Sequence, residues 1–325
     1  MPPIGLAPQG LRRLALHPLA GRFAGAAFLA GLLILPSFIR DAYMIRVLDL
    51  AGIYVLLSLG LNIVVGYAGL LDLGYVAFYA VGAYLYALLA SPQLGYHLPF
   101  LVIFILGGAL AALAGALIGA PTLRLRGDYL AIVTMAFGEI IRILLNNLDG
   151  LTNGPQGIMQ IDVPTIFGFH LDSPLRIYYF IVLLCVVAVY FIQNLERSKI
   201  GRAWAAIRED EDAARAMGLN TRNLKLLAFA MGATTAGMAG VIFAGLQQFV
   251  SPESFTFWES IFILCMVVLG GMGSIPGIIL GAFLLVTIPE VFRDFADYRM
   301  LGFGIALVLM MVFRPQGLLG TAKGK

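Results

Sequence analysis

Residues 47–90 read VLDLAGIYVLLSLGLNIVVGYAGLLDLGYVAFYAVGAYLYALLA, and this stretch decides the fold class. Between residues 47 and 120 the only charged side chains are Asp49 and Asp72. A helix needs about 20 mostly apolar residues to cross the hydrocarbon core of a bilayer. The stretch is long enough for several crossings, so it predicts a series of membrane-spanning helices.

The composition of the whole chain indicates the same class. Of its 325 residues, 60% are hydrophobic and 12% are charged, whereas a soluble domain has about 45–50% apolar and about 25% charged residues. The formal net charge is +3, and no basic stripe with interleaved aromatics occurs, which argues against nucleic-acid binding. Cys185 and Cys265 lie in apolar runs and are expected as small core residues without a disulfide.

Ten apolar stretches are candidate spans, which predicts an all-α, polytopic membrane helix bundle of about ten transmembrane segments. The first follows Arg12, Arg13 and Arg22, as in a secretory signal, but no small-residue cleavage site follows Leu35-Pro36. We therefore expect it to remain as a span. The ten stretches are 23–39, 47–65, 70–90, 98–120, 129–146, 176–194, 224–249, 259–271, 276–289 and 299–313.

Lys and Arg set the expected orientation, because they are enriched in cytoplasmic loops. They gather on one side if the N-terminus is cytoplasmic, and ten spans then return the C-terminus to the same side. This orientation predicts a cytoplasmic tail at 1–22, a transmembrane domain at 23–313 and a second cytoplasmic tail at 314–325. It places the charge-dense segment 195–223 in the cytosol and the longest outer loop, 147–175, on the opposite side as an ordered cap.

Two glycine-rich sequences interrupt the helical pattern. They are GYAGLLDLG at 66–74 and GGMGSIPG at 270–277, and each is followed by Gly-Ala-aromatic-Leu, at 82–85 and 281–284. Both fall on the same side in the expected topology, which suggests a degenerate internal repeat with broken or re-entrant helices. Two tight turns between helices explain the pattern equally well. Residues at these breaks that are candidates for lining a transport pathway are Gly69, Gly273 and Ser274.

Further glycines recur at short intervals within the apolar stretches. Small residues at such spacing let helices approach closely in a bilayer, so we expect a packing role for them. They are Gly107, Gly108, Gly115 and Gly119 in one stretch, and Gly232, Gly237, Gly240 and Gly245 in another.

Three of the ionisable residues within the expected spans are candidates for lining a pathway. Glu139 and Arg142 are three residues apart on one helical face, so they either line an aqueous path or form an ion pair that fixes the helix in the bundle. The second interpretation is favoured. Asp72 is expected as the N-cap of the third span, with pathway lining as the alternative.

The segment 198–219 combines helical apolar spacing with a high density of charge. Trp204 and Ile207 belong to its apolar stripe, which Glu211 interrupts. The pattern predicts a short amphipathic helix that docks on a cytoplasmic partner. A helix on the membrane surface is the alternative, but the acidic run 209–212 would be repelled by anionic lipid.

Sequence motifs for enzymatic chemistry are lacking. His17, His97 and His170 have no His or Cys neighbour at metal-ligand spacing, and no Gly-x-Ser-x-Gly motif occurs. The glycine-rich run at 270–277 lacks the Lys-Ser/Thr of a phosphate-binding loop. We therefore expect no catalytic residue, metal or cofactor in this chain, and any driving nucleotide must bind another chain.

Several long motifs resemble those of the permease subunits of branched-chain amino acid ABC transporters, and among these the LivM-like subunits. The resemblance covers nearly the whole chain after about residue 45. The motifs are GYAGLLDLGYVAFYAVGAY (66–84), LRLRGDYLAIVTMAFGEIIRILLNN (123–147), TNGPQGI (152–158), IGRAWAAIREDEDAARAMGL (200–219) and VSPESFTFWESIFILCMVVLGGMGSIPGIILG (250–281).

The resemblance implies a multi-pass subunit of the bacterial inner membrane, with the outer loop in the periplasm. It implies a second homologous permease subunit, two cytoplasmic ATPase subunits that bind ATP and Mg²⁺, and a periplasmic amino-acid-binding protein as partners, besides membrane lipid. Residues 201–218 would then couple ATPase closure to alternation of the pathway. The implied coupling residues are Gly201 and Gly218, the anchors Trp204 and Ile207, and the charged Arg202, Arg208, Glu209 and Asp210.

The implied substrate is Leu, Ile or Val, but permeases of the same family also carry urea, short amides or other amino acids. A rival class is an ion-coupled secondary transporter or channel, in which the broken spans and Glu139 would form the coupling site. The two classes differ in whether they need separate ATPase subunits.

Overall fold

The chain divides into two compact units, Met1–Ile45 and Arg46–Lys325. The first unit, as far as it is described, has a helical stretch at 31–36 and the beginning of helix α2. The expected N-terminal tail, most of the expected C-terminal tail and most of the spans 23–39 and 299–313 lie outside the described residues. The computed structural model describes residues 31–36, 41–122, 125, 127–166, 168–291, 304–305, 308 and 317–319.

The second unit is mostly helical, as predicted. Within the described residues, five helical segments are long and apolar enough to cross a bilayer, and α3 and α12 are shorter apolar helices. Short strands, which the sequence did not predict, form two antiparallel pairs, β1 with β4 and β2 with β3. The described elements are α2 (Ala42–Asn62), η2 (Ile63–Tyr67), α3 (Val76–Leu89), α4 (Phe100–Thr122), α5 (Asp128–Asn147), α6 (Asp149–Thr152), η3 (Gly154–Gln156), β1 (Ile158–Met159), β2 (Thr165–Ile166), β3 (Phe169–His170), α7 (Pro174–Arg197), α8 (Lys199–Glu209), α9 (Glu211–Ala216), α10 (Thr221–Gln247), β4 (Phe249–Val250), η4 (Pro252–Phe255), α11 (Phe257–Gly270) and α12 (Ile275–Val291).

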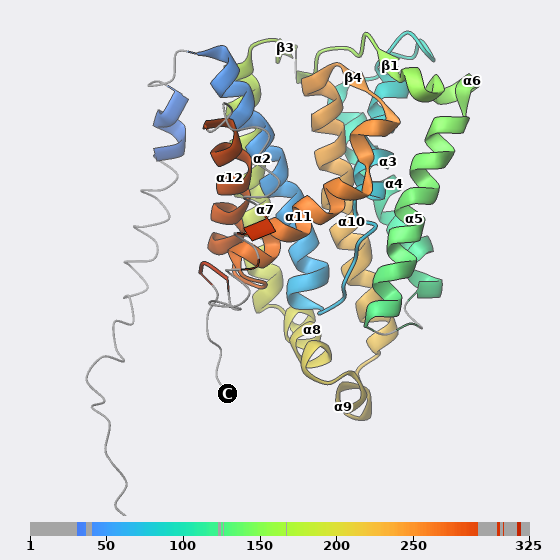
Figure 1. The fold of residues 1–325 in the computed structure, drawn as a ribbon, viewed down its shortest axis with the longest axis vertical. Helices are drawn as coiled ribbons and strands as arrows, with labels where there is room; N and C mark the ends of the chain where they lie inside the picture. The colour runs from blue at the N-terminus through green and yellow to red at the C-terminus, as the bar shows by residue number, and fades with distance from the viewer. Residues whose placement is uncertain are drawn as a thin grey trace, which may run out of the picture. The chain divides into compact units, whose positions relative to one another are not determined.

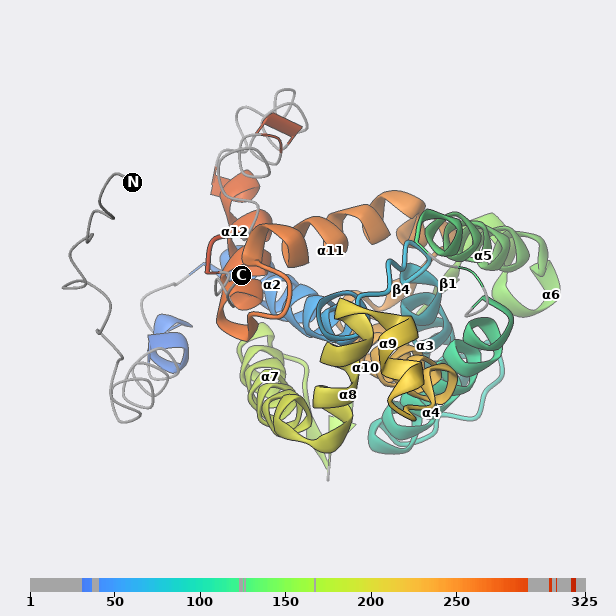
Figure 2. The ribbon, with the colours of Figure 1, turned by 90° about the horizontal axis from the view of Figure 1, so that it is seen from below.

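Helix α10 packs along α3 and α4 at the core of the second unit (Figures 1 and 2). Glycines make this close approach possible. A Cβ atom on Gly82 of α3 would lie 2.0 Å from the carbonyl oxygen of Gly237 in α10, and a Cβ on Gly237 would lie 2.4 Å from the Cβ of Ala111 in α4. A Cβ on Gly115 of α4 would likewise lie 2.7 Å from the Cβ of Ala233 in α10, so these contacts confirm the packing role predicted for the glycines of α4 and α10.

Adding one methyl group at this crossing therefore tests the packing. We expect Gly237→Ala to force the helices apart and to destabilise the fold by about 1–3 kcal/mol, as overpacking does. The matched control is Gly150→Ala in α6, where an added Cβ would meet no atom within 4 Å. Thermal unfolding in detergent measures both variants, and equal melting temperatures would contradict the packing account.

The chain leaves regular helical geometry at two breaks that adjoin one another. The first is residues 68–75, which follow the π-helical turn η2 and turn back from the lower end of α2 toward α3 (Figure 1). The second is residues 271–274, between α11 and α12. The amide of Gly273 donates a 2.8 Å hydrogen bond to Oδ1 of Asn62, the last residue of α2. Both breaks thus lie at one end of the second unit.

The two breaks differ in form. Helix α3 has only 14 residues, a rise of about 21 Å, because the irregular first break occupies part of that span. Backbone groups in and beside this break are paired within the protein, as irregular backbone at membrane depth requires. The amide of Leu73 donates to Thr134 Oγ1 at 3.0 Å, and the amide of Val76, the first residue of α3, donates to Ser260 Oγ at 3.1 Å. The second break is a short turn. The first break is therefore irregular backbone and the second is a turn between helices, while the internal repeat and re-entrant helices stay predictions.

The long loop expected at 147–175 is folded onto the upper end of the second unit (Figure 1). The amide of Asp162 donates to the carbonyl of Ala90 at 2.7 Å, and the hydroxyl of Tyr86 donates to the carbonyl of Asp162 at 3.0 Å. Strand β1 pairs with β4, which follows α10. The loop is therefore attached to both α3 and α10.

Candidate functional site

The charge-dense segment forms two helices, whereas the sequence led us to expect one. Ser198 begins α8, where its hydroxyl accepts hydrogen bonds from the amides two and three residues further on. Asp210 has an extended backbone that ends α8, and its carboxylate accepts the amides of Asp212 and Ala213, both at 2.9 Å, to begin α9. Asp is a strong N-cap, and this second cap divides the segment. Both helices project at the lower end of the second unit (Figures 1 and 2).

Two apolar residues of α8 fasten it to the bundle. Trp204 is fully buried, and its Nε1 donates a 2.7 Å hydrogen bond to the carbonyl of Leu224 at the start of α10. Ile207 is also buried. The protein itself thus covers these side chains, which the family resemblance implied as partner anchors, and their role at a partner stays a prediction.

Glu211 interrupts the apolar stripe because it pairs with a buried lysine. Its Oε2 accepts from Lys225 Nζ at 2.5 Å, and the side chain of Lys225 is only 5% exposed. Arg215 also contacts Glu211, at 3.2 Å. A buried charge needs such a partner. The pair holds α9 against α10.

Arg208 extends from α8 to the two helix breaks. Its guanidinium donates a hydrogen bond to the carbonyl of Gly66, within the π-helical turn η2. A Cβ atom on Gly69 would lie 2.8 Å from Arg208 Cγ, and one on Gly273 would lie 3.7 Å from its Nη1. The pathway candidates Gly69 and Gly273 therefore line the contact between α8 and the breaks. The sequence implied only a partner-facing charge at Arg208 and did not reveal this inward contact.

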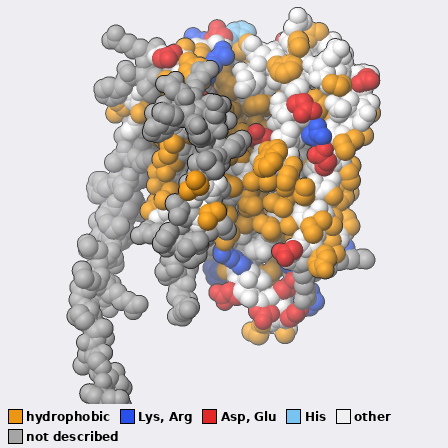
Figure 3. Space-filling view, viewed as in Figure 1, with side chains coloured by type: hydrophobic (Ala, Val, Ile, Leu, Met, Phe, Trp, Pro, Cys, Tyr) orange, Lys and Arg blue, Asp and Glu red, His pale blue; other side chains and the backbone are white. Residues whose placement is uncertain are grey.

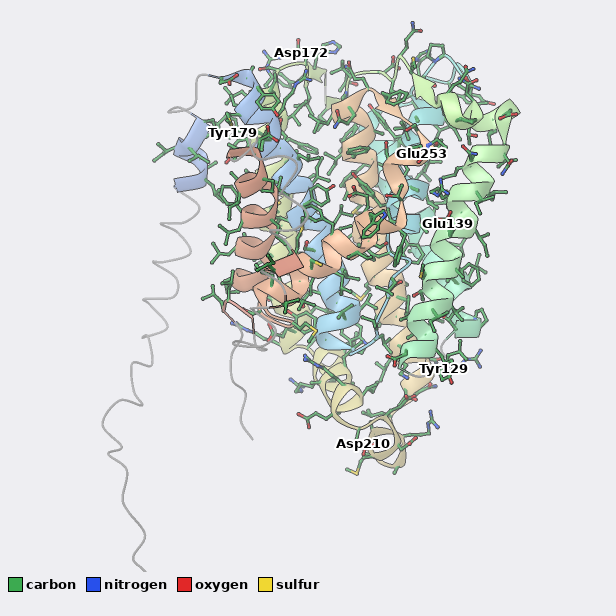
Figure 4. All side chains as sticks on the ribbon, viewed as in Figure 1. Tyr129, Glu139, Asp172, Tyr179, Asp210 and Glu253 are labelled. Atoms are coloured by element: carbon green, nitrogen blue, oxygen red, sulfur yellow. The ribbon has the colours of Figure 1, made fainter. Side chains whose placement is uncertain are left out.

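The exposed residues of the segment 199–217, which contains α8 and α9, form what we call the α8–α9 surface, and they carry both signs of charge. They include Arg202, Glu209, Asp210 and Met217. Figure 3 shows acidic and basic side chains gathered at this lower end, and Figure 4 labels Asp210 there. The two predicted glycines occupy the edges of the segment: Gly201 is buried at the corner between α7 and α8, and Gly218, with φ +86°, follows α9. The other described residues of the second unit leave this surface exposed, and it suits a charged protein partner.

Asp72 and Ser274, which both lie at the breaks, form hydrogen bonds with backbone groups. Asp72 is buried and accepts the amide of Gly74 at 2.9 Å. It is not the N-cap predicted for the third span, because α3 begins only at Val76 and its N-cap is Tyr75. Ser274 Oγ donates to the carbonyl of Leu319 at 2.9 Å.

Glu139 and Arg142 form an ion pair, and Arg142 also pairs with a third residue, Glu253. Arg142 Nε donates to both carboxylate oxygens of Glu139 at 3.1 Å, and its Nη1 donates to Glu253 Oε1 at 3.1 Å. Figure 4 labels both glutamates. The sequence did not predict Glu253, because it lies in η4, 111 residues from Arg142. The pathway candidates thus fall into two groups, one at the breaks and one on α5.

Residues 43–313 match the sequence family described as branched-chain amino acid transport system / permease component. The chain belongs to this permease family. It is 48% identical to the high-affinity branched-chain amino acid transport system permease protein LivM of Escherichia coli K12, over 92% of this chain and 78% of LivM. It is also 48% identical to LivM of Salmonella typhimurium, over 90% of this chain and 74% of that protein.

The permease is similar to a second kind of subunit as well. It is 23% identical to the high-affinity branched-chain amino acid transport system permease protein LivH of Escherichia coli K12, over 85% of this chain and 94% of LivH. No solved structure matches the chain. The transport system named for these relatives therefore contains two permease proteins that are both similar to this one.

The buried position of Trp204 in this permease predicts a structural effect of its removal. We expect Trp204→Ala to destabilise the attachment of α8 by about 3–5 kcal/mol, through lost packing and a lost hydrogen bond. Arg202→Ala, on the exposed side of the same helix, is the control and should leave stability unchanged. Thermal unfolding in detergent compares the two. A Trp204→Ala protein as stable as the control would place the indole outside the core.

Proposed function

We propose that this chain is a permease subunit of an ATP-driven importer that moves Leu, Ile and Val across the bacterial inner membrane by alternating access. Family membership and the 48% identity to LivM support the class of protein and the class of substrate. The observation that carries the mechanism is the contact between Arg208 and Gly66, which joins a charged surface helix to the broken spans.

Separate subunits supply the energy in this proposal. Two cytoplasmic ATPases, which bind ATP and Mg²⁺, dock on the α8–α9 surface, where Arg202, Glu209 and Asp210 provide charges of both signs. A second permease homologous to this chain completes the membrane part, as the similarity to both LivM and LivH suggests. A periplasmic binding protein delivers the amino acid.

The proposed topology has about ten spans, with both termini in the cytosol and the loop 147–175 in the periplasm. The density of Lys and Arg between residues 197 and 225 supports a cytosolic α8–α9 surface. The position of that surface at the end opposite the folded loop is consistent with this orientation (Figure 1). The two breaks would be corresponding parts of a degenerate internal repeat.

Coupling requires that a movement of α8 reaches the spans. Trp204 and the Glu211–Lys225 pair hold α8 and α9 on α10, so ATPase closure moves these helices together. Arg208 carries the movement to the carbonyl of Gly66 and to the neighbouring Gly273. Small shifts at such contacts can switch packed helices between two arrangements.

Reconstitution tests the proposed function. The chain is incorporated into vesicles with a second permease, ATPases and a binding protein, and uptake of leucine, isoleucine, valine and urea is compared. We expect uptake of the three amino acids that requires ATP and every subunit. Uptake by this chain alone, driven by an ion gradient, would contradict the importer, and selective uptake of urea would contradict the substrate.

Charge reversal at the α8–α9 surface should weaken ATPase binding. We expect Glu209→Lys to lower the affinity of the permease complex for the ATPase subunits roughly three- to tenfold, because the residue is exposed and bears a charge that a partner can recognise. Asp172→Lys, in the loop at the opposite end, is the control. Titration of labelled ATPase into the detergent-solubilised complex measures both, and equal affinities would exclude Glu209 from the interface.

A further inference from the structure

Glu139 and Arg142 lie at the middle of α5, and the face of the helix that carries them is poorly suited to contact with lipid. Glu139 lies 11 residues after Asp128, where α5 begins, which corresponds to a rise of about 17 Å. Figure 4 shows it midway along α5, far from Tyr129 at the lower end. The side chains of Glu139 and Glu253 are 40% and 67% exposed. A charge at the centre of a bilayer costs about 2.5–3.5 kcal/mol or more, so lipid is a poor cover for this face.

The exposed faces of α4 and α7 are of a different kind. Helix α4 has no charged residue, and the charges of α7 are confined to Arg176, Glu196 and Arg197 near its ends. Ile105 on α4 and Leu183 on α7 are 64% and 59% exposed. Such apolar faces suit lipid. The group formed by Glu139, Arg142 and Glu253, which we call the ion cluster, therefore distinguishes α5 from both helices.

The chemistry of the cluster indicates what covers it. Two carboxylates share one guanidinium, which leaves a net charge of −1 on the exposed side. Trp258, five residues after Glu253 and in the first turn of α11, is 70% exposed. Figure 3 shows acidic and basic side chains together within a hydrophobic surface on this side. Trp and Arg are enriched among the residues that dominate the centres of protein interfaces.

We propose that the face formed by α5, η4 and the first turn of α11, which we call the α5–α11 face, is the interface with the second, homologous permease subunit. This inference rests on the proposed function. Glu139, Arg142, Glu253 and Trp258 form its centre, and the partner presents hydrogen-bond donors or a basic side chain opposite the two glutamates.

The depth of the ion cluster in the membrane and its net charge both favour a second, different permease as the partner at this face. The ATPases and the binding protein of the proposed importer lie outside the bilayer, so only another membrane subunit reaches the middle of α5. A second copy of this chain, docked symmetrically through the same face, would bring two clusters of charge −1 together. A partner that is homologous to this chain but differs from it in sequence avoids that repulsion. LivM and LivH, which are both similar to this chain, are two different permeases of this kind.

Photocross-linking in the assembled complex tests the interface. Met135 and Trp258 on the α5–α11 face, and Ile105 and Leu183 as lipid-facing controls, are replaced one at a time by p-benzoylphenylalanine. We expect a covalent adduct with the tagged second permease from the first two positions, at least roughly tenfold above the controls. Adducts with lipid alone, with another copy of this chain, or no more abundant than at the controls would each overturn the proposal.

The ion cluster is tested separately by Arg142→Gln, which leaves two glutamates without their cation. We expect co-purification of the second permease to fall roughly tenfold, since an unpaired charge in an interface is costly. Arg176→Gln removes the cation of an exposed pair with Asp172 and should leave assembly intact. Equal assembly of the two variants would overturn the role of the cluster.

Leucine uptake by the wild-type complex separates this inference from the proposed function. Uptake that depends on ATP, combined with adducts only from the control positions, would reject the α5–α11 interface and leave the importer in place. A wild-type complex that takes up no leucine, or that contains no second permease, would instead reject the proposed function.

Discussion

Two hydrogen bonds at the helix breaks hold together the parts of this protein that the proposed transport cycle would move. Asn62 accepts the amide of Gly273, and Arg208 donates to the carbonyl of Gly66. Backbone groups freed by a break need partners within the protein, because lipid supplies none. The first bond joins the two breaks, and the second joins them to α8. Helix α8, at the surface, therefore supplies part of the hydrogen bonding that the backbone of the broken spans needs.

A continuous set of contacts leads from the α8–α9 surface to the core. Trp204 and the Glu211–Lys225 pair hold α8 and α9 to α10, and Gly237 lets α10 approach α3 and α4 closely. These contacts favour movement of the helices as a body. The backbone at the breaks, where Gly69 and Gly273 have positive φ angles, is where a change of conformation can be accommodated.

The sequence located most of these features but not how they connect. Apolar runs and glycine spacing predicted the helices, the breaks and the close crossings, because these depend on local composition. The division of α8 from α9 was missed because the capping strength of Asp210 competes with helical periodicity. The inward contact of Arg208 and the partnership of Glu253 with Arg142 could not be predicted, because both join segments more than a hundred residues apart. Neither pairing leaves a signal in one sequence.

The most direct test of this account is the amount of leucine transported per ATP hydrolysed by reconstituted Arg208→Ala and Arg202→Ala complexes. Both residues are on α8, but only Arg208 bonds to the break at Gly66. We predict that Arg208→Ala retains bound, hydrolysing ATPase subunits while its ratio falls at least about fivefold, the scale of a modest coupling free energy. Arg202→Ala removes a proposed docking charge but no contact with the break, so it should keep the wild-type ratio of leucine transported to ATP hydrolysed even where it weakens ATPase binding. An unchanged ratio in Arg208→Ala would show that the bond from Arg208 to Gly66 does not couple ATP hydrolysis to transport.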